Sequence, residues 1–326
     1  MSEFLSAYGM FLVELLTLAL LGVAIFALIA ANRRGGRAQG IHVEHLNRRF
    51  EETADALEDA MAGKRAKKQA KARGKERKRE ERERAKQETG RPRLFVLDFK
   101  GDIRASAVAS LREEVSAVLN VATDQDQVLL RLENPGGTVH EHGFAASQLM
   151  RIKQRKLKLL IAVDKVAASG GYLMACVADH IVAAPFAIIG SIGVVAQLPN
   201  FHRLLEEKGI DFEQLTAGRY KRTLTLFGKN TDEGREKLRE EIEDVHELFK
   251  SQIREHRPQV DVEQVATGEH WYGLRALELK LVDELRTSDD FLLEAAKERD
   301  LYAVTFKRKR SLPERLLAGA ETLLSR

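Results

Sequence analysis

A serine stands on a turn of small residues in the stretch DKVAASGGYLMA, residues 164–175. An apolar run ends just before Ser169, and a helical pattern begins just after it. The turn presents the hydroxyl beside the N–H of Gly170, at a helix N-terminus that favours developing negative charge. This pattern is compatible with nucleophilic attack by Ser169, with an oxyanion held at Gly170, although a serine in this position more commonly serves as a helix cap.

Two further glycine-marked turns follow predicted strands: ENPGG, residues 133–137, and GSIG, residues 190–193. In parallel α/β proteins, catalytic groups gather at the carboxyl ends of strands. Glycines let the backbone approach a substrate closely, so Gly136 or Gly137 is a candidate for a second oxyanion donor. Pro-Gly is also ordinary turn chemistry, so this motif alone is weak.

A serine needs a base, because its hydroxyl is a poor nucleophile at its free pKa. We interpret the histidines closest to the glycine turns as ordinary surface or core residues: His140, His142 and His180. A lysine kept neutral by burial is the other option. Lys221 lies among Gly, Tyr, Thr, Leu and Phe residues, but it is one of more than 20 lysines.

The elements that must position these residues follow from the patterning beyond Arg93. Short apolar runs alternate with amphipathic helices, which is typical of an α/β domain with buried, largely parallel strands. The predicted strands cover residues 94–99, 127–132, 157–163 and 180–184. The predicted helices lie near residues 106–120, 139–155, 170–178 and 231–256, the last ended by Pro258.

An apolar run over residues 8–31 has Glu14 as its only charge and is long enough to cross a bilayer. We predict a retained anchor over residues 1–31, because Glu3 alone precedes the run where a signal peptide has basic residues. Three arginines follow directly, so the positive-inside rule predicts a cytoplasmic location for the rest of the chain.

Residues 32–92 are charged and poor in apolar residues, which predicts a helical or disordered linker. Within it, residues 64–86 hold 13 Lys or Arg against 4 Glu, a local charge of +9 against +4 for the whole chain. The basicity is therefore local, and no nucleic-acid partner is predicted. The one cysteine, Cys176, lies in a helical pattern and is interpreted as a small core residue.

A second uncharged stretch, residues 181–200, also resembles a membrane span. Pro185 and several glycines break it into pieces too short to cross, so we predict a buried strand, a loop and a strand.

Five motifs together resemble one known family. ENPGG, DKVAASGGYLMA, GSIGVV, AGRYKRTLT and ATGEHWYGLRALELKLVDEL occur in this order over about residues 95–305. The set resembles the signal peptide peptidase A family of serine-lysine membrane peptidases, in particular inner-membrane members with an anchor and one catalytic unit. The resemblance implies a crotonase-like, Clp-protease-like α/β spiral over residues 93–307. Residues 308–326 are then an amphipathic or disordered tail.

The resemblance implies a role for each matching residue. Ser169 is the expected nucleophile, and Lys221, 52 residues further on, is the expected general base. Gly136 and Gly170 are the expected oxyanion donors. The expected substrate groove is formed by Gly137, Gly190, Ser191, Ile192 and Gly193. Ser191 is also expected to orient Lys221.

Two departures from the family's commoner pattern are visible. Glu133 and Asn134 stand where Asn or Asp followed by Ser is often found. Lys165 stands where Arg or Met is also seen. Neither departure touches Ser169 or Lys221.

The implied mechanism is acyl transfer through a serine-lysine dyad on a peptide or on a remnant of a membrane protein. No metal or other cofactor is expected, because no metal-binding or nucleotide-binding motif is present in the sequence. A second span at residues 181–200 would put Ser169 and Lys221 on opposite sides of the membrane, which argues again for a buried strand pair there.

Two other functions stay open: an acyl-CoA enzyme of the crotonase type, and a catalytically degenerate membrane scaffold. The family forms rings whose subunits complete each other's sites, so a homo-oligomer is expected. The side of the membrane is also open. The resemblance implies an envelope peptidase that often faces the periplasm, whereas the charge rule predicts the cytoplasm.

Overall fold

The computed structural model describes residues 9–10, 15–19, 22, 40–61 and 91–308. Two compact units divide the chain: residues 42–305 hold the fold described below, and residues 1–41 with 306–326 form the other. Most of the predicted anchor, the basic tract and nearly all of the tail lie outside the described residues. In the part of the chain that the structure describes, no helix is both long and apolar enough to cross a membrane.

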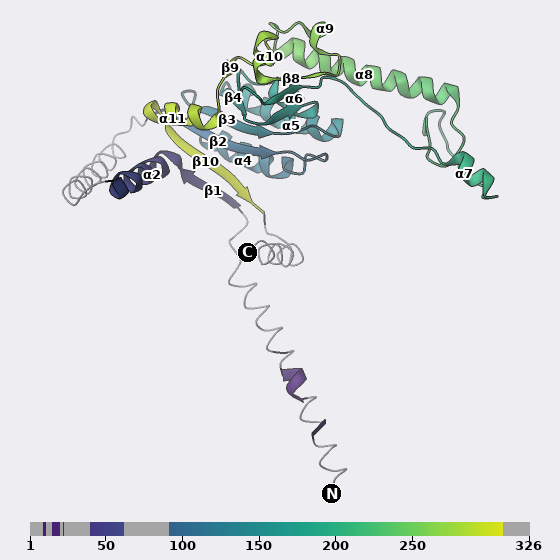
Figure 1. Ribbon diagram of the computed structural model, residues 1–326, viewed down its shortest axis with the longest axis horizontal. Coiled ribbons are helices and arrows are strands. Elements are labelled where there is room, and N and C mark those ends of the chain that lie inside the picture. The colour runs from purple at the N-terminus through teal and green to yellow at the C-terminus, as the bar shows by residue number, and fades with distance from the viewer. Residues whose placement is uncertain (1–8, 11–14, 20–21, 23–39, 62–90, 309–326) are drawn as a thin grey trace. The chain divides into compact units, whose positions relative to one another are not determined.

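A seven-stranded sheet lies at the centre of the larger unit (Figure 1). The strand order is β1-β10-β2-β3-β4-β6-β9, and neighbours from β10 to β9 are parallel. The strands are β1 (Gly40–His45), β2 (Arg93–Lys100), β3 (Gln127–Glu133), β4 (Lys158–Val163), β6 (His180–Ala183), β9 (Glu284–Leu285) and β10 (Asp300–Lys307). The four strands predicted between residues 94 and 184 are confirmed as β2, β3, β4 and β6.

Apolar side chains alternate along β2 between the two faces of this sheet. Phe95, Leu97 and Phe99 join one buried layer, whereas Leu94 and Val96 join the other. The first layer is completed by helices α4 (Val108–Val121), α5 (Val139–Gln154) and α6 (Gly170–Ala175). The second is completed by helices α2 (Leu46–Met61) and α11 (Ser288–Glu298). Both faces are covered, which is why the strands are continuously apolar.

The structure differs from the linker prediction over residues 40–61, which form β1 and α2. Leu46 is only 2% exposed and packs with Phe50 on the second layer. The Asn47 amide donates to the carbonyl oxygens of Ala296 and Arg299 and accepts from the Leu301 N–H. Two apolar residues four positions apart, Leu46 and Phe50, are enough to pack this largely charged helix against the sheet. The average composition of residues 32–92 did not reveal them.

A three-stranded sheet carries the turns of interest. It consists of β5 (Val166–Ala168), β7 (Ile188–Gly190) and β8 (His270–Tyr272). A bridge between Asn134 and Ala167 ties it to the end of β3. The uncharged stretch 181–200 supplies β6 and β7 rather than a helix, in agreement with its interpretation as strand, loop and strand up to Gly190.

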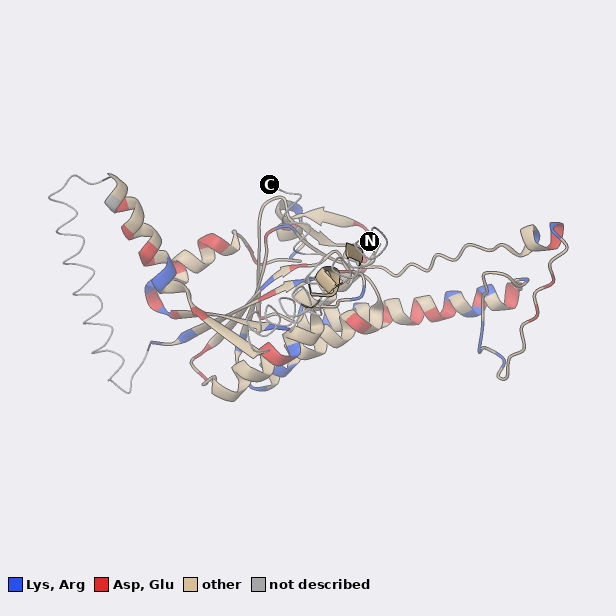
Figure 2. Cartoon of the chain, turned by 90° about the horizontal axis from the view of Figure 1, so that it is seen from below, with Lys and Arg blue, Asp and Glu red and all other residues tan. Residues whose placement is uncertain are grey.

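A long helix, α8 (Asp232–His256), carries the chain back from an extended segment, residues 194–231, which we call the arm. Figures 1 and 2 both show the arm leaving the core and returning at the N-terminus of α8. No side chain of the arm is buried. The remaining helices are α7 (His202–Glu207), α9 (Val262–Val265) and α10 (Gly273–Glu278).

Candidate active site

Ser169 occupies a strained turn between β5 and α6. Its backbone angles are φ 51° and ψ −121°, a conformation that L-residues with a Cβ rarely adopt. The turn is held by its N–H, which donates to the Gly190 carbonyl at 2.7 Å, and by its carbonyl, which accepts from Leu173 N–H at 3.0 Å. The side chain makes no capping hydrogen bond. The hydroxyl is therefore presented without being used as a helix cap.

The loop after β3 lies directly against this turn. A Cβ on Gly136, which has φ 95°, would lie 2.7 Å from the Ser169 Cβ, so only glycine fits. The Gly136 N–H donates to Asn134 Oδ1 at 2.9 Å and is already engaged within the loop. The Gly137 N–H, in contrast, donates to no acceptor among the described residues. Gly137 also lines the pocket beside Ser169, so of the two glycines that the sequence offered as donors it fits the role that the resemblance assigned to Gly136.

Gly170 begins α6 and faces the fully buried His142 ring. A Cβ here would lie 2.4 Å from the His142 Cγ, so a larger residue would displace the imidazole or the turn. The first N–H groups of a helix lack partners within the helix. Gly170 therefore offers an N–H beside Ser169, as the sequence pattern favours.

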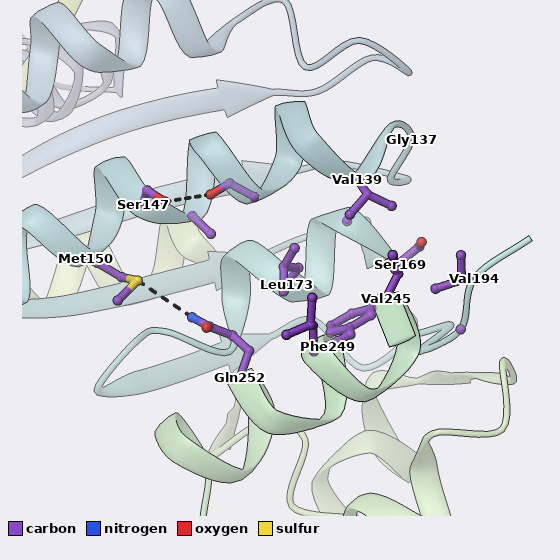
Figure 3. A pocket seen from close by; sticks show the side chains of 15 residues that line it. Gly137, Val139, Ser147, Met150, Ser169, Leu173, Val194, Val245, Phe249 and Gln252 are labelled. Carbon is purple, nitrogen blue, oxygen red and sulfur yellow. Dashed lines mark hydrogen bonds between the residues drawn. The ribbon is translucent and has the colours of Figure 1, made fainter. Parts of the chain in front are cut away.

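An apolar pocket opens next to Ser169 (Figure 3). Its volume is about 220 Å³, smaller than the roughly 300–1,000 Å³ of sites for drug-sized ligands. It is lined by Gly137, Val139, Gly143, Ala146, Ser147, Met150, Ser169, Gly170, Leu173, Gly193, Val194, Val245, Leu248, Phe249 and Gln252. Gln252 Nε2 lies 3.7 Å from the Met150 sulfur, and Ser147 donates to the Gly143 carbonyl at 2.9 Å. The pocket suits one large apolar side chain.

The expected groove residues divide into two groups. Gly137 and Gly193 line the pocket. Gly190 packs against Trp271, the Ile192 side chain is fully buried, and neither residue lines this pocket. Ser191 has φ 52°, and its N–H donates to the Glu269 carbonyl at 2.6 Å.

Lys221 lies on the arm, and its side chain is exposed. Its neighbours lie along the first turns of α8, because Arg219 pairs with Glu233 at 2.7 Å and Lys237 lies over the Tyr220 ring. The pocket uses α8 only from Val245 onward. Lys237 and Val245 are eight positions apart on α8, which corresponds to about 12 Å along the helix axis at about 1.5 Å per residue. Lys221 is accordingly not among the residues that line the pocket beside Ser169.

Behind α6, Cys176 is fully buried, and its Sγ donates to the Leu173 carbonyl at 3.3 Å. Burial raises the pKa of this thiol to about 12, so it is a core residue rather than a nucleophile. Within the described ranges, no group of three or more His, Cys, Asp or Glu side chains is placed to hold a metal ion.

The contribution of α8 to the pocket was not predicted from the sequence. Val245, Phe249 and Gln252 recur at helical spacing along one face of a helix that is otherwise charged. That spacing indicates a packed face. It does not say what the face covers, since this depends on the path of the arm that precedes the helix.

Comparison with known proteins gives a family. A model of peptidase family S49 N-terminal matches residues 3–149, and a model of peptidase family S49 matches residues 151–302. "Probable protease SohB" of Haemophilus influenzae is 47% identical to this chain, and the alignment covers 98% of this chain and 94% of the length of that relative. "Probable protease SohB" of Buchnera aphidicola subsp. Acyrthosiphon pisum is 54% identical over 73% of this chain and 72% of its own.

A solved structure of the 1510-N membrane-bound stomatin-specific protease is more distant, with 15% identity and a TM-score of 0.41 over 63% of this chain and 85% of that one. The family models and the curated relatives confirm the resemblance drawn from the five motifs. The chain therefore belongs to peptidase family S49, among its SohB-type members.

Proposed function

We propose that this peptidase is a membrane-anchored serine endopeptidase in which Ser169 is the nucleophile and Lys221 of a neighbouring copy is the general base. The observation that carries the proposal is the strained turn that presents an uncapped Ser169 hydroxyl at the mouth of an apolar pocket. The N–H groups of Gly137 and Gly170 are the proposed oxyanion donors.

The chemistry follows from these positions. The neutral amine of Lys221 takes the proton of the Ser169 hydroxyl as its oxygen attacks the peptide carbonyl, and the N–H pair holds the resulting oxyanion. Collapse breaks the peptide bond, and the Lys221 ammonium returns the proton to the leaving amine. Water, deprotonated by the same lysine, then releases the acyl-enzyme and restores the serine.

We infer that the arm docks on a neighbouring copy, because it is exposed and carries many apolar side chains. Between Leu198 and Phe227 it exposes eight large apolar or aromatic side chains by 40% or more, and the most exposed of them is Leu215, at 96%. Contiguous apolar exposure of this kind marks an interaction surface. An arm that docks on a second copy would bury these residues and carry Lys221 to a site other than its own. This supports the homo-oligomer that the family resemblance implies.

The proposed substrates are peptides or remnants of membrane proteins with a large apolar residue before the scissile bond, because the pocket beside Ser169 is apolar. The crotonase-like, Clp-protease-like spiral stays part of the proposal. It is supported by the parallel order of the large sheet and by the small second sheet that carries the Ser169 turn. Membership of a peptidase family leaves the acyl-CoA alternative without support.

Labelling tests the nucleophile. A fluorophosphonate probe should modify wild type at Ser169 and leave Ser169→Ala and Lys221→Ala unmodified. Labelling that persists in Ser169→Ala would assign the nucleophile elsewhere. No labelling of wild type would favour the catalytically degenerate scaffold.

Mixing two inactive variants tests the neighbouring copy. Ser169→Ala and Lys221→Ala are unfolded together and refolded in equal amounts, and peptidase turnover is measured. If each site takes its serine and lysine from adjacent copies, random assembly completes about a quarter of the sites. If both residues come from one chain, every site in the mixture lacks one of them. No recovery of turnover would therefore assign the dyad to a single chain.

We also propose that residues 8–31 anchor the chain in the bacterial inner membrane with the peptidase domain in the cytoplasm. Three arginines and no acidic residue before Glu44 follow the apolar run, which favours the cytoplasmic side. A single cysteine at Gly90 in a Cys176→Ser background should react with an impermeant maleimide only after spheroplasts are lysed. Labelling of intact spheroplasts would instead place the domain in the periplasm.

A further inference from the structure

Two fully buried polar side chains, which the proposed mechanism does not use, lie in or against the loop of residues 134–138, which we call the oxyanion loop. Asn134 and His142 both have 0% exposure. Burying polar groups is costly unless hydrogen bonds compensate it. Their hydrogen bonds therefore show what these residues hold in place.

The two side chains tie the loop of residues 134–138 into a closed ring. His142 Nδ1 lies 2.9 Å from the Thr138 carbonyl oxygen, and Nε2 lies 3.2 Å from Asn134 Oδ1. The Gly136 N–H donates to the same Oδ1 at 2.9 Å. Each ring nitrogen faces an oxygen, to which it donates when it carries the proton. One imidazole thus spans both ends of the loop that contains Gly137.

The same two residues also hold the nucleophile turn. The Asn134 N–H donates to the Val166 carbonyl at 2.8 Å, and its carbonyl accepts from the Ala168 N–H at 3.0 Å. The Asn134 amide nitrogen donates to the sulfur of Met174, on α6, at 3.3 Å. The His142 ring packs on Gly170, where even a Cβ would overlap it. The strand before Ser169 and the helix after it are therefore both in contact with this pair.

We propose that His142 is a positioning residue, which acts through Asn134 to fix the directions of the Gly137 and Gly170 N–H groups. The inference rests on the proposed serine peptidase function. Oxyanion donors must be held within tenths of an ångström, and losing one costs about 10²–10³-fold in kcat. Freeing the loop displaces donors without removing them, so we expect a loss of about 10-fold to 100-fold.

Two substitutions of His142 separate the two contacts of the ring, because each puts an amide nitrogen in the place of one ring nitrogen. In His142→Gln the amide nitrogen falls near the place of Nε2 and can donate to Asn134 Oδ1. In His142→Asn it falls near the place of Nδ1 and reaches only the Thr138 carbonyl. Both variants lose the ring and its packing, so a merely structural role predicts equal effects. We expect His142→Asn to lose at least about 10-fold in kcat with KM within twofold, and His142→Gln to stay within about threefold of wild type.

A second readout compares the ground state with the transition state. A peptide boronate, which forms a tetrahedral adduct on Ser169, should bind His142→Asn more weakly by the factor lost in kcat. Binding of a substrate peptide to Ser169→Ala should be unchanged when His142→Asn is added. Asn134→Ser shortens the other partner and should reproduce the loss, and the double variant with His142→Asn should be no worse than either alone. Because Asn134→Ser tests the same contact from its other side, the proposal can still be tested if His142→Asn does not fold.

Equal kcat values for the two His142 variants, or a change confined to KM, would overturn the positioning role. Independent, multiplicative effects of Asn134→Ser and His142→Asn would do the same. Failure of the proposed function is a different result, because wild type itself would then show no turnover that depends on Ser169.

Discussion

The two halves of the proposed dyad lie in regions that are built in opposite ways. The Ser169 turn is fixed by hydrogen bonds to Gly190 and Leu173 and is backed by fully buried side chains. Lys221 lies on an arm without one buried side chain. A single chain therefore preorganises the proposed nucleophile and oxyanion donors, whereas the position of the proposed base depends on what the arm contacts.

The arm has local order of its own. Asn200 donates to the carbonyl oxygens of Thr225 and Gly228, and Phe227 packs near Phe201 and Phe212 with ring centroids 6.1 and 5.7 Å away. These contacts close the arm on itself and leave its apolar side chains exposed. Folding and completion of the site are therefore separate here: the core folds around the proposed nucleophile and oxyanion donors, and assembly is expected to supply the base.

The largest expected effect comes from removing either half. Ser169→Ala and Lys221→Ala should each lower kcat by more than about 10³-fold, because a nucleophile and its base act as one unit. The double variant should be no less active than the single ones. Peptidase turnover of the four proteins gives the comparison. Effects that multiply in the double variant would show that the two residues act in separate steps.

The core should also be the more sensitive region in stability. Arg257 is 2% exposed and pairs with Asp283 at 2.7 Å. Asp283→Asn leaves this guanidinium without its charge partner and should cost about 3 kcal/mol of unfolding free energy, measured with urea. Glu278→Gln breaks an exposed pair with Arg275 and serves as the control, with an expected cost below about 1 kcal/mol. Similar costs for both would mean that the buried pair is not a principal stabiliser.

Acid should weaken the core through the same carboxylate. Burial opposes ionisation of Asp283, but hydrogen bonds from Arg257 and the Ile181 N–H prevail and hold its pKa below the ordinary 3.8. A depressed pKa contributes stability above the ordinary value, and this contribution is lost as the pH falls through the folded value. The penalty of Asp283→Asn should therefore be full at pH 7 and shrink below about pH 4. Urea unfolding of the wild type and of Asp283→Asn, at pH 7 and below about pH 4, measures this penalty. A penalty that does not change with pH would contradict a depressed pKa of Asp283.

The pocket offers a smaller and more selective change. Gly143 lines it from α5, and a Cβ there meets open space. Gly143→Leu should fill the pocket and lower kcat/KM at least about 10-fold for peptides with a large apolar residue before the scissile bond, but not for those with alanine. Gly143→Ala is the matched control and should gain up to about 1 kcal/mol of stability from helix propensity. Equal losses for both peptides would place the specificity pocket elsewhere.

The smallest effect on the core is expected from the arm. Phe227→Ala removes the ring between Phe201 and Phe212 and should change amide exchange of β2, β3 and β4 by less than about 0.5 kcal/mol. Assembly and turnover should nevertheless fall, as light scattering and peptidase assays report. A matching loss of protection in the central strands would show that the arm belongs to the same folding unit.

Much of this fold was predictable because its signals are local. Continuous apolar runs marked β2, β3, β4 and β6, and the stop at Pro258 marked the end of α8. The Ser169 turn was also marked locally, by a serine between small residues at a strand end, but this position suits a helix cap as well, and only the further motifs favoured a nucleophile. Burial of Leu46 and Phe50 was not predictable from composition, because two apolar residues in a charged helix gain meaning only from the sheet face that accepts them.

The sequence by itself determined the family, the alternation of strands and helices, and Ser169 as the candidate nucleophile, because these depend on residue types at short range. Tertiary structure decided the rest. It paired the Gly136 N–H with Asn134, whereas the Gly137 N–H has no acceptor among the described residues; it also brought α8 to the pocket and buried His142 behind the oxyanion loop. It also placed Lys221 on an exposed arm, outside the residues that line the pocket beside Ser169. Each of these depends on distances between segments far apart in the sequence, which residue spacing does not encode.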